Sequence, residues 1–171
     1  MVRQYKRKKT GFTLIEAGIV VALITLAVTL SVNNFGLFER LLVRTQAEKL
    51  FLTCRYLQQC AIINNQEYSL EFDPQKNSYS YNNQENILFK SVKLGFLPGV
   101  YGPPSNPVHA IKNPITFTHN KITFHPDGII QSGTVYLIDE NTNAMYAITS
   151  PISQFSFLRL YRYNGKWHCL T

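Results

Sequence analysis

The sequence KKTGFTLIE, from Lys8 to Glu16, opens an apolar run that continues to Val32. The 21 residues of segment 12–32 are mostly Leu, Ile, Val, Ala and Thr, and Glu16 is their only charged residue. A helix rises about 1.5 Å per residue, so this run reaches roughly 30 Å, the thickness of one bilayer core. The run therefore predicts a transmembrane segment over residues 12–32.

Basic charge is concentrated before the apolar run. Five of the seventeen Lys and Arg residues lie in segment 1–11, which holds no acidic residue: Arg3, Lys6, Arg7, Lys8 and Lys9. Without them, twelve basic residues face ten acidic ones, and the net charge falls from +7 to +2. Basic flanks of a membrane segment stay in the cytoplasm. The charge thus predicts a cytoplasmic N-terminus and a head outside the inner membrane, and it says little about a ligand.

Two other kinds of segment begin in a similar way. A secretory signal has an apolar core of roughly 7–15 residues that an Ala-x-Ala type site closes. This run is longer, and no such site closes it. A plain membrane anchor gives no reason for Glu16, because a carboxylate within a span costs on the order of 2.5–3.5 kcal/mol. The glutamate therefore needs a partner.

The stretch KKTGFTLIEA resembles the leader and cleavage signature of type IV prepilins and type II secretion pseudopilins. In that family a membrane prepilin peptidase cuts on the cytoplasmic side after the glycine, here Gly11, and methylates the new first residue, here Phe12. The resemblance implies a leader peptide over residues 1–11. It also implies a role in filament assembly for Glu16, which would meet the free amine of a neighbouring subunit's first residue. A plain membrane anchor remains the alternative.

The sequence from Val32 to about Asn65 contains no strong helix breaker. Apolar residues spaced four and three apart form one helical face: Val43, Ala47, Leu50, Cys54, Leu57 and Ala61. We expect one long N-terminal helix, transmembrane at first and amphipathic over residues 33–65, that packs on a globular head. Gly36 and the pair Asn33-Asn34 are weak points where this helix can bend. Many pilins carry a proline near Asn33, and this sequence does not.

Residues 66–171 change to the alternation of strands. The predicted strands are Tyr68–Phe72, Ser78–Tyr81, Ile87–Val92, Ile115–Thr118, Lys121–Phe124, Thr134–Asp139, Ala144–Thr149, Phe157–Tyr163 and Lys166–Cys169. The pair Asn164-Gly165 predicts a type I′ hairpin turn. Segment 95–114 is rich in Pro and Gly, which predicts a long irregular loop that forms an exposed contact surface. The fold class is therefore α+β and type IV pilin-like, with a mainly antiparallel sheet in the head.

The C-terminal half carries a second resemblance. The stretch KITFHPDG (121–128), followed by SGTV (132–135) and a closing hairpin, is similar to the head of the pseudopilin H/FimT family of minor pilins. Members of that family often show a Phe-x-Pro-x-Gly turn and then a strand that begins with Gly-Thr. Segment 65–120 matches no pattern that we can assign to a family.

No catalytic arrangement stands out in the sequence. His109, His119, His125 and His168 lack the short paired spacing of a zinc site, although His119 and His125 can approach each other across a hairpin. Asp127 is best explained as a turn residue. The sequence contains no Gly-rich phosphate loop, nucleophilic serine elbow or paired carboxylate motif. We expect no enzymatic activity, no metal site and no cofactor.

The three cysteines allow a disulfide. Cys54 and Cys60 lie six residues apart on the predicted helix, roughly 9 Å along its axis, which is beyond the roughly 7 Å limit between the Cα atoms of a disulfide. Because Cys54 lies on the apolar face, the prediction favours Cys54–Cys169 over Cys60–Cys169 in an oxidising periplasm. Three unpaired thiols are the alternative.

Basic and aromatic residues alternate around the last hairpin. Because alternate residues of a strand share a face, Arg159 projects with Tyr161 and Tyr163, while Arg162 points the other way. Together with Lys166 these arginines suggest a DNA contact, with phosphates bound by the cations and bases stacked on the rings. The alternative is a solvated strand with ordinary aromatic packing.

These observations favour a minor pseudopilin, a structural subunit of the periplasmic pseudopilus of a type II secretion system. The expected partners are prepilin peptidase, the inner membrane, and other pseudopilins or pilins through the N-terminal helix. The expected location is the bacterial inner membrane, in a single pass with the C-terminal domain in the periplasm. A FimT-like minor pilin that binds DNA through its C-terminal hairpin is the second hypothesis. A single-span protein with an enzymatic head is the third.

Overall fold

The structure is a computed structural model that describes residues 13–32, 35–151 and 157–171. The first of two compact units spans residues 1–35 and contains helix α1 (Leu14–Val32), whose side chains from Leu14 to Thr29 are all exposed. No helix within the described residues is long and apolar enough to cross a membrane. The predicted leader 1–11 and the first residue of the predicted span, Phe12, lie outside the described residues.

Helix α2 (Phe35–Asn64) begins the head, and its apolar face is the predicted one. All six residues of the predicted face have no exposed surface: Val43, Ala47, Leu50, Cys54, Leu57 and Ala61. The helix ends because Asn65 adopts a positive φ of 50° and the amide of Gln66 donates to Ala61 O at 3.2 Å. This is the αL residue and 6→1 hydrogen bond of a Schellman cap. The one long helix of the prediction is described in two segments, α1 and α2, and its continuity stays a prediction because Asn33-Asn34 lies outside the described residues.

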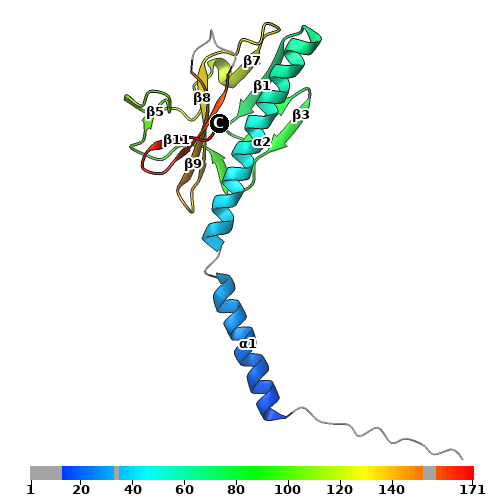
Figure 1. Ribbon diagram of the computed structural model, residues 1–171, viewed down its shortest axis with the longest axis vertical. Coiled ribbons are helices and arrows are strands. Elements are labelled where there is room, and N and C mark those ends of the chain that lie inside the picture. Colours follow the sequence, from blue (N-terminus) through cyan, green and yellow to red (C-terminus); the bar gives the residue numbers. More distant parts are fainter. Residues whose placement is uncertain (1–12, 33–34, 152–156) are drawn as a thin grey trace, which may run out of the picture. The chain divides into compact units, whose positions relative to one another are not determined.

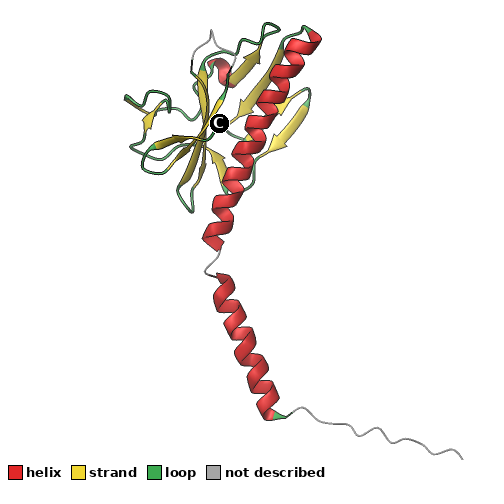
Figure 2. Cartoon of the chain, viewed as in Figure 1, coloured by secondary structure: helices red, strands yellow, loops and turns green. Residues whose placement is uncertain are grey.

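Two antiparallel sheets pack against α2 (Figures 1 and 2). Sheet A has the order β3-β2-β1-β7, and its strands are β1 (Tyr68–Asp73), β2 (Ser78–Tyr81), β3 (Gln84–Ile87) and β7 (Lys121–Phe124). Sheet B has the order β11-β10-β9-β8-β4, and its strands are β4 (Val92–Leu94), β8 (Gly133–Asp139), β9 (Ala144–Ser150), β10 (Arg159–Tyr163) and β11 (Trp167–Cys169). The fold is therefore α+β, as predicted.

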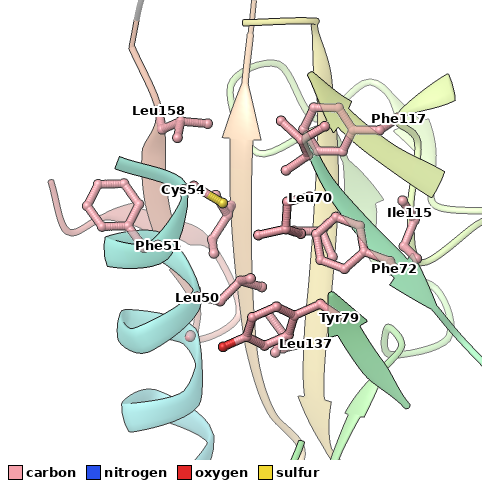
Figure 3. Packing of buried hydrophobic residues seen from close by; sticks show 14 of the residues in the cluster. Leu50, Phe51, Cys54, Leu70, Phe72, Tyr79, Ile115, Phe117, Leu137 and Leu158 are labelled. Carbon is pink, nitrogen blue, oxygen red and sulfur yellow. The ribbon is translucent and has the colours of Figure 1, made fainter. Parts of the chain in front are cut away.

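The main core lies where α2 faces the two sheets (Figure 3). Leu50 and Cys54 of α2 meet Leu70 and Tyr79 of sheet A and Leu137 of sheet B in this cluster. Each of these side chains is at most 1% exposed. Burying one large apolar side chain contributes roughly 1.5–3 kcal/mol, so this layer is the main source of the head's stability.

A second core lies on the opposite face of sheet B. Alternate residues of β8 and β9 point to opposite faces, so Val135 and Ile148 enter the main core while Tyr136 and Met145 enter the second one. Segment 95–114, which we call the strap, covers this face with Phe96, Leu97, Val100 and Ile111. The strap includes the short strands β5 (Tyr101–Gly102) and β6 (His109–Ala110), and Figure 1 shows β5 on the side of β8 and β9 away from α2.

The strap differs from its prediction in two ways. It contains one antiparallel strand pair, and Val100 is only 5% exposed. The reason is that strands β8 to β10 carry apolar side chains on both faces, so the outer face needs a cover. Twelve of the twenty strap residues are nevertheless exposed, Tyr101, Val108 and Lys112 among them.

Two predicted strands are wrong. In segment 87–92, β3 of sheet A ends at Ile87 and β4 of sheet B begins at Val92, and residues 88–91 connect the two sheets without joining either. Segment 115–118 forms one bridge, between Ile115 and Val135, before the short 3₁₀ helix η1 (Thr118–Asn120). The other predicted strands are present, with ends shifted by a few residues.

The hairpin turns also differ from prediction. The last hairpin pairs Tyr163 with Trp167, which leaves three residues in the loop instead of two. Of the predicted pair, Gly165 has a positive φ of 70° and Asn164 does not have a positive φ, so the turn is not type I′. A two-residue turn with two positive φ values, 47° and 61°, occurs at Asn82-Asn83 between β2 and β3.

Candidate functional site

The start of α1 holds Glu16 in a capping box with Thr13. The backbone N–H of Thr13 donates to Glu16 Oε2 at 2.9 Å, and its hydroxyl donates to the same oxygen at 3.0 Å. The N–H of Glu16 lies 3.3 Å from Thr13 Oγ1 and completes the reciprocal arrangement. The carboxylate is therefore fixed beside the N-terminus of the helix, where the helix dipole favours negative charge.

This geometry adds one residue to the predicted assembly site. The sequence-based prediction included Glu16 but not Thr13, and the role of Glu16 in assembly stays a prediction. The signal was available, because Thr-x-x-Glu before an apolar run is the pattern of a capping box. Gly11 and Phe12, the predicted cleavage and methylation residues, lie outside the described residues.

The predicted DNA contacts are exposed but divided between two faces of sheet B. Arg159 and Arg162 of β10 and Lys166 of the following loop are all exposed. The Arg159 guanidinium lies 4.8 Å from the centre of the Phe157 ring. Arg162 shares a face of β10 with Leu160 of the main core and so lies on the α2 side, whereas Arg159 lies on the side of Tyr161 in the second core. The two arginines therefore do not form one surface.

The aromatic rings of this hairpin take part in internal packing. Tyr161 is 6% exposed and belongs to the second core. The rings of Tyr163 and Trp167 lie 5.1 Å apart, and Trp167 Nε1 donates to Tyr101 O of the strap at 2.8 Å. Stacking with bases needs exposed ring faces, which the buried Tyr161 lacks. The arrangement matches ordinary aromatic packing more closely than a DNA contact.

The cysteines do not form the predicted Cys54–Cys169 disulfide, and all three are free thiols. Cys54 points into the main core (Figure 3) and has no exposed surface. Burial raises the pKa of its thiol to about 12. Cys169 lies exposed on β11, where its Sγ is 3.0 Å from Thr171 O. The side chains of Cys54 and Cys169 are separated because that of Cys54 lies in the core and that of Cys169 lies on the surface. Cys60 is half-buried.

The histidines remain scattered in the fold. In the part of the chain that the structure describes, no three His, Cys, Asp or Glu residues are placed to hold a metal ion. His125 Nδ1 lies 3.5 Å from Glu67 Oε2, while His119 lies exposed in η1 with a positive φ of 56°. Asp127 Oδ1 accepts the N–H of Ile129 at 2.9 Å and is a turn residue, as predicted.

Comparisons with known proteins give one distant likeness. No family model and no curated protein matches this sequence. A solved structure, the minor pseudopilin EpsH from the Type 2 Secretion System of Vibrio cholerae, is similar with a TM-score of 0.49 and 14% sequence identity. The similarity covers 69% of this chain and 94% of that chain.

Proposed function

We propose that this chain is a minor pseudopilin, a structural subunit of the periplasmic pseudopilus of a type II secretion system. Prepilin peptidase removes residues 1–11 and methylates Phe12. Segment 12–32 holds the subunit in the bacterial inner membrane, with its N-terminus in the cytoplasm and its head in the periplasm. Other pseudopilins or pilins then pack against its N-terminal helix.

One observation carries this proposal: the capping box fixes the Glu16 carboxylate in the first turn of an apolar helix, four positions after Phe12 in the sequence. A carboxylate that is fixed beside an apolar helix can form a salt bridge with the positively charged amine of a neighbouring subunit. Salt bridges between desolvated partners depend on both charges, because an unpaired charge in an apolar setting is costly. Two further features agree with the proposal: the basic residues of segment 1–11, and the amphipathic α2 against antiparallel sheets.

The test compares two substitutions of Glu16. Glu16→Leu removes both the charge and the capping oxygen, whereas Glu16→Gln keeps an acceptor for the Thr13 N–H and removes only the charge. If Glu16 pairs with an amine, both variants are processed normally and both fail to enter the filament. Filament incorporation is measured by shearing and immunoblot, and processing by the mass of the N-terminal peptide.

Two outcomes contradict the proposal. Normal incorporation of Glu16→Gln shows that the glutamate serves only as a helix cap. Cleavage that persists in Gly11→Ala argues against prepilin peptidase and revives the hypothesis of a plain membrane anchor. Salt-sensitive mobility shift of DNA by the full chain in detergent would favour the DNA-binding minor pilin instead.

A further inference from the structure

The loop of the last hairpin contains an Asn-Gly pair whose asparagine the turn does not require. Asn164, Gly165 and Lys166 connect β10 to β11, and all three are exposed. A type I′ turn needs a positive φ at both residues of the pair, and only Gly165 has one. Of the nine glycines in the sequence, Gly165 alone follows an asparagine. The turn geometry therefore does not explain the Asn164 side chain.

The side chain of Asn164 and the nitrogen of Gly165 are both open to solvent. Within the described residues, this loop has one backbone hydrogen bond, from the Asn164 N–H to Lys166 O at 3.0 Å. That bond uses neither the Asn164 side-chain amide nor the Gly165 N–H. A Cβ placed on Gly165 would meet no atom within 4 Å, so the space around this residue is empty. Glycine has no side chain of its own to shield its nitrogen.

Comparable groups elsewhere in the head are held by hydrogen bonds. In the Asp127-Gly128 pair, the Gly128 N–H donates to His125 O at 2.9 Å, and the Asp127 carboxylate accepts a backbone N–H, also at 2.9 Å. The side-chain amide of Asn77 is bonded at both its nitrogen and its oxygen to the backbone around β4. The Asn164-Gly165 pair therefore differs from these two in having its reacting groups unbonded.

We propose that Asn164, a residue of a thermolabile type, is a site of spontaneous deamidation. The Gly165 nitrogen attacks Cγ of Asn164 and forms a five-membered succinimide. The proton of the Gly165 N–H leaves with the Asn164 side-chain nitrogen, which departs as ammonia. Water then opens the ring. Water that breaks the bond from nitrogen to Cγ leaves aspartate, and water that breaks the bond from nitrogen to the backbone carbonyl carbon leaves isoaspartate.

The two products act differently on the hairpin. Both add a carboxylate two positions from Arg162 and from Lys166 in the sequence, so the charge of the loop becomes less positive. Isoaspartate also lengthens the backbone of the loop by one carbon atom. The strand after the loop carries Trp167, whose Nε1 donates to Tyr101 O of the strap at 2.8 Å. Isoaspartate therefore loosens the strap, whereas aspartate changes only the charge.

The experiment incubates the full chain in detergent at pH 7 and pH 9 and follows the peptide 141–171 that Glu-C digestion releases. Fragment masses locate the conversion of an amide to a carboxylate. Asn143 lies in the same peptide and is exposed as well, but Ala144 follows it and its methyl group hinders attack. We expect Asn164 to convert several times faster than Asn143, and faster at pH 9, because the attacking nitrogen must lose its proton. Equal rates at the two asparagines would overturn the proposal.

Two variants separate the site from its consequence. Asn164→Gln keeps a side-chain amide but requires a six-membered ring, so enzymatic methylation of isoaspartate should fall to the background of the fresh chain. Persistent methylation of this variant would overturn Asn164 as the site. Fresh Asn164→Asp carries the charge on a normal backbone, and trypsin should cut it at Lys112 as slowly as the fresh parent. Incubated parent should be cut there several times faster than incubated Asn164→Gln, and equal cutting would overturn the effect on the strap.

Discussion

At the scale of single residues, Asn77 joins the two sheets. It lies between β1 and β2 with a positive φ of 53°, its side-chain amide donates to Val92 O, and its Oδ1 accepts the N–H of Leu94 at 2.9 Å. The N–H of Leu88 also donates to Asn77 O at 3.0 Å. One residue of the sheet A hairpin therefore positions β4 at the edge of sheet B.

We predict that Asn77→Gly lowers the free energy of unfolding by about 1–3 kcal/mol, because two hydrogen bonds to the backbone around β4 are lost. Glycine tolerates the positive φ but gives the unfolded chain more conformational entropy, so the side chain's share is the difference between this loss and that of a matched glycine control. Asn77→Ala should cost about 1 kcal/mol more, because alanine is strained at that φ. Denaturant unfolding measures both values. Asn83→Gly, at an exposed residue with φ of 61°, is the control and should change stability little.

Cys54 illustrates how burial controls reactivity. Because burial raises the pKa of its thiol to about 12, the reactive thiolate is scarce at neutral pH. We predict that iodoacetamide modifies the exposed Cys169 in the native protein and modifies Cys54 only after unfolding. Peptide mass mapping of labelled protein checks this prediction. Rapid labelling of Cys54 under native conditions would mean that α2 separates from the sheets.

At the scale of secondary-structure elements, α2 has one buried face and one exposed face. Leu50 has no exposed surface, whereas Leu52, two positions along the helix, is 64% exposed. The two residues have the same side chain and the same helix propensity, so they form a matched pair. The difference between them measures packing on the sheets.

We predict that Leu50→Ala lowers the free energy of unfolding by about 2–5 kcal/mol, the usual range for a core leucine. Leu52→Ala should change it by no more than about 0.5 kcal/mol, because its side chain is largely solvated. Both are measured by denaturant unfolding monitored by circular dichroism. Equal effects of the two substitutions would contradict the packing of α2 described above.

The strap is an element that side-chain contacts hold in place. Trp167 Nε1 donates to Tyr101 O at 2.8 Å, and the Trp167 ring lies 6.0 Å from that of Tyr136. Gly102 permits the close approach to sheet B, since a Cβ there would lie 2.4 Å from Tyr136 Oη. These contacts hold the strap over the second core.

We predict that Trp167→Phe loosens the strap, because phenylalanine keeps an aromatic ring but lacks the N–H donor. Limited digestion with trypsin should then cut at Lys112 several times faster than in the parent, while cleavage at Arg55 in α2 stays slow. Mass spectrometry of early fragments gives both rates. Unchanged cleavage at Lys112 would show that the hydrogen bond does not hold the strap.

At the scale of the whole molecule, buried ionisable groups make stability depend on pH in the alkaline range. Burial raises the pKa of Tyr136 from 10.0 to about 12, so the unfolded chain releases this proton at lower pH than the folded one. The contribution of Tyr136 to stability is complete below pH 10 and is lost as the pH rises from 10 to 12. Cys54 acts in the same direction between pH 9.0 and about 12.

We predict that the free energy of unfolding falls less steeply above pH 10 in Tyr136→Phe than in the parent. The two slopes should differ by up to about 1.4 kcal/mol per pH unit. Urea unfolding at pH 9, 10 and 11 measures the two slopes. Tyr101→Phe is the control: its side chain is 55% exposed, and the variant should follow the parent. If Tyr136→Phe also follows the parent, the Tyr136 hydroxyl is solvated in the native protein.

Local patterns explain which parts of the fold were predictable. The buried face of α2 follows from apolar residues three and four apart, and β8 and β9 follow from dense apolar residues between turns. Glu16 was singled out from its sequence, although its capping partner Thr13, three residues away, was not, and its role in assembly stays a prediction. The boundary between β3 and β4 was missed, because where a strand leaves one sheet for another depends on contacts with distant segments.

The sequence by itself determined the helices, most strands and the charge pattern around KKTGFTLIE, because each depends on residues within a few positions of one another. Only the tertiary structure decided that the strap covers a second core, that Asn77 links the sheets and that Cys54 and Cys169 stay apart. These features depend on segments that are distant in sequence. Burial of apolar surface on both faces of sheet B brings these segments together.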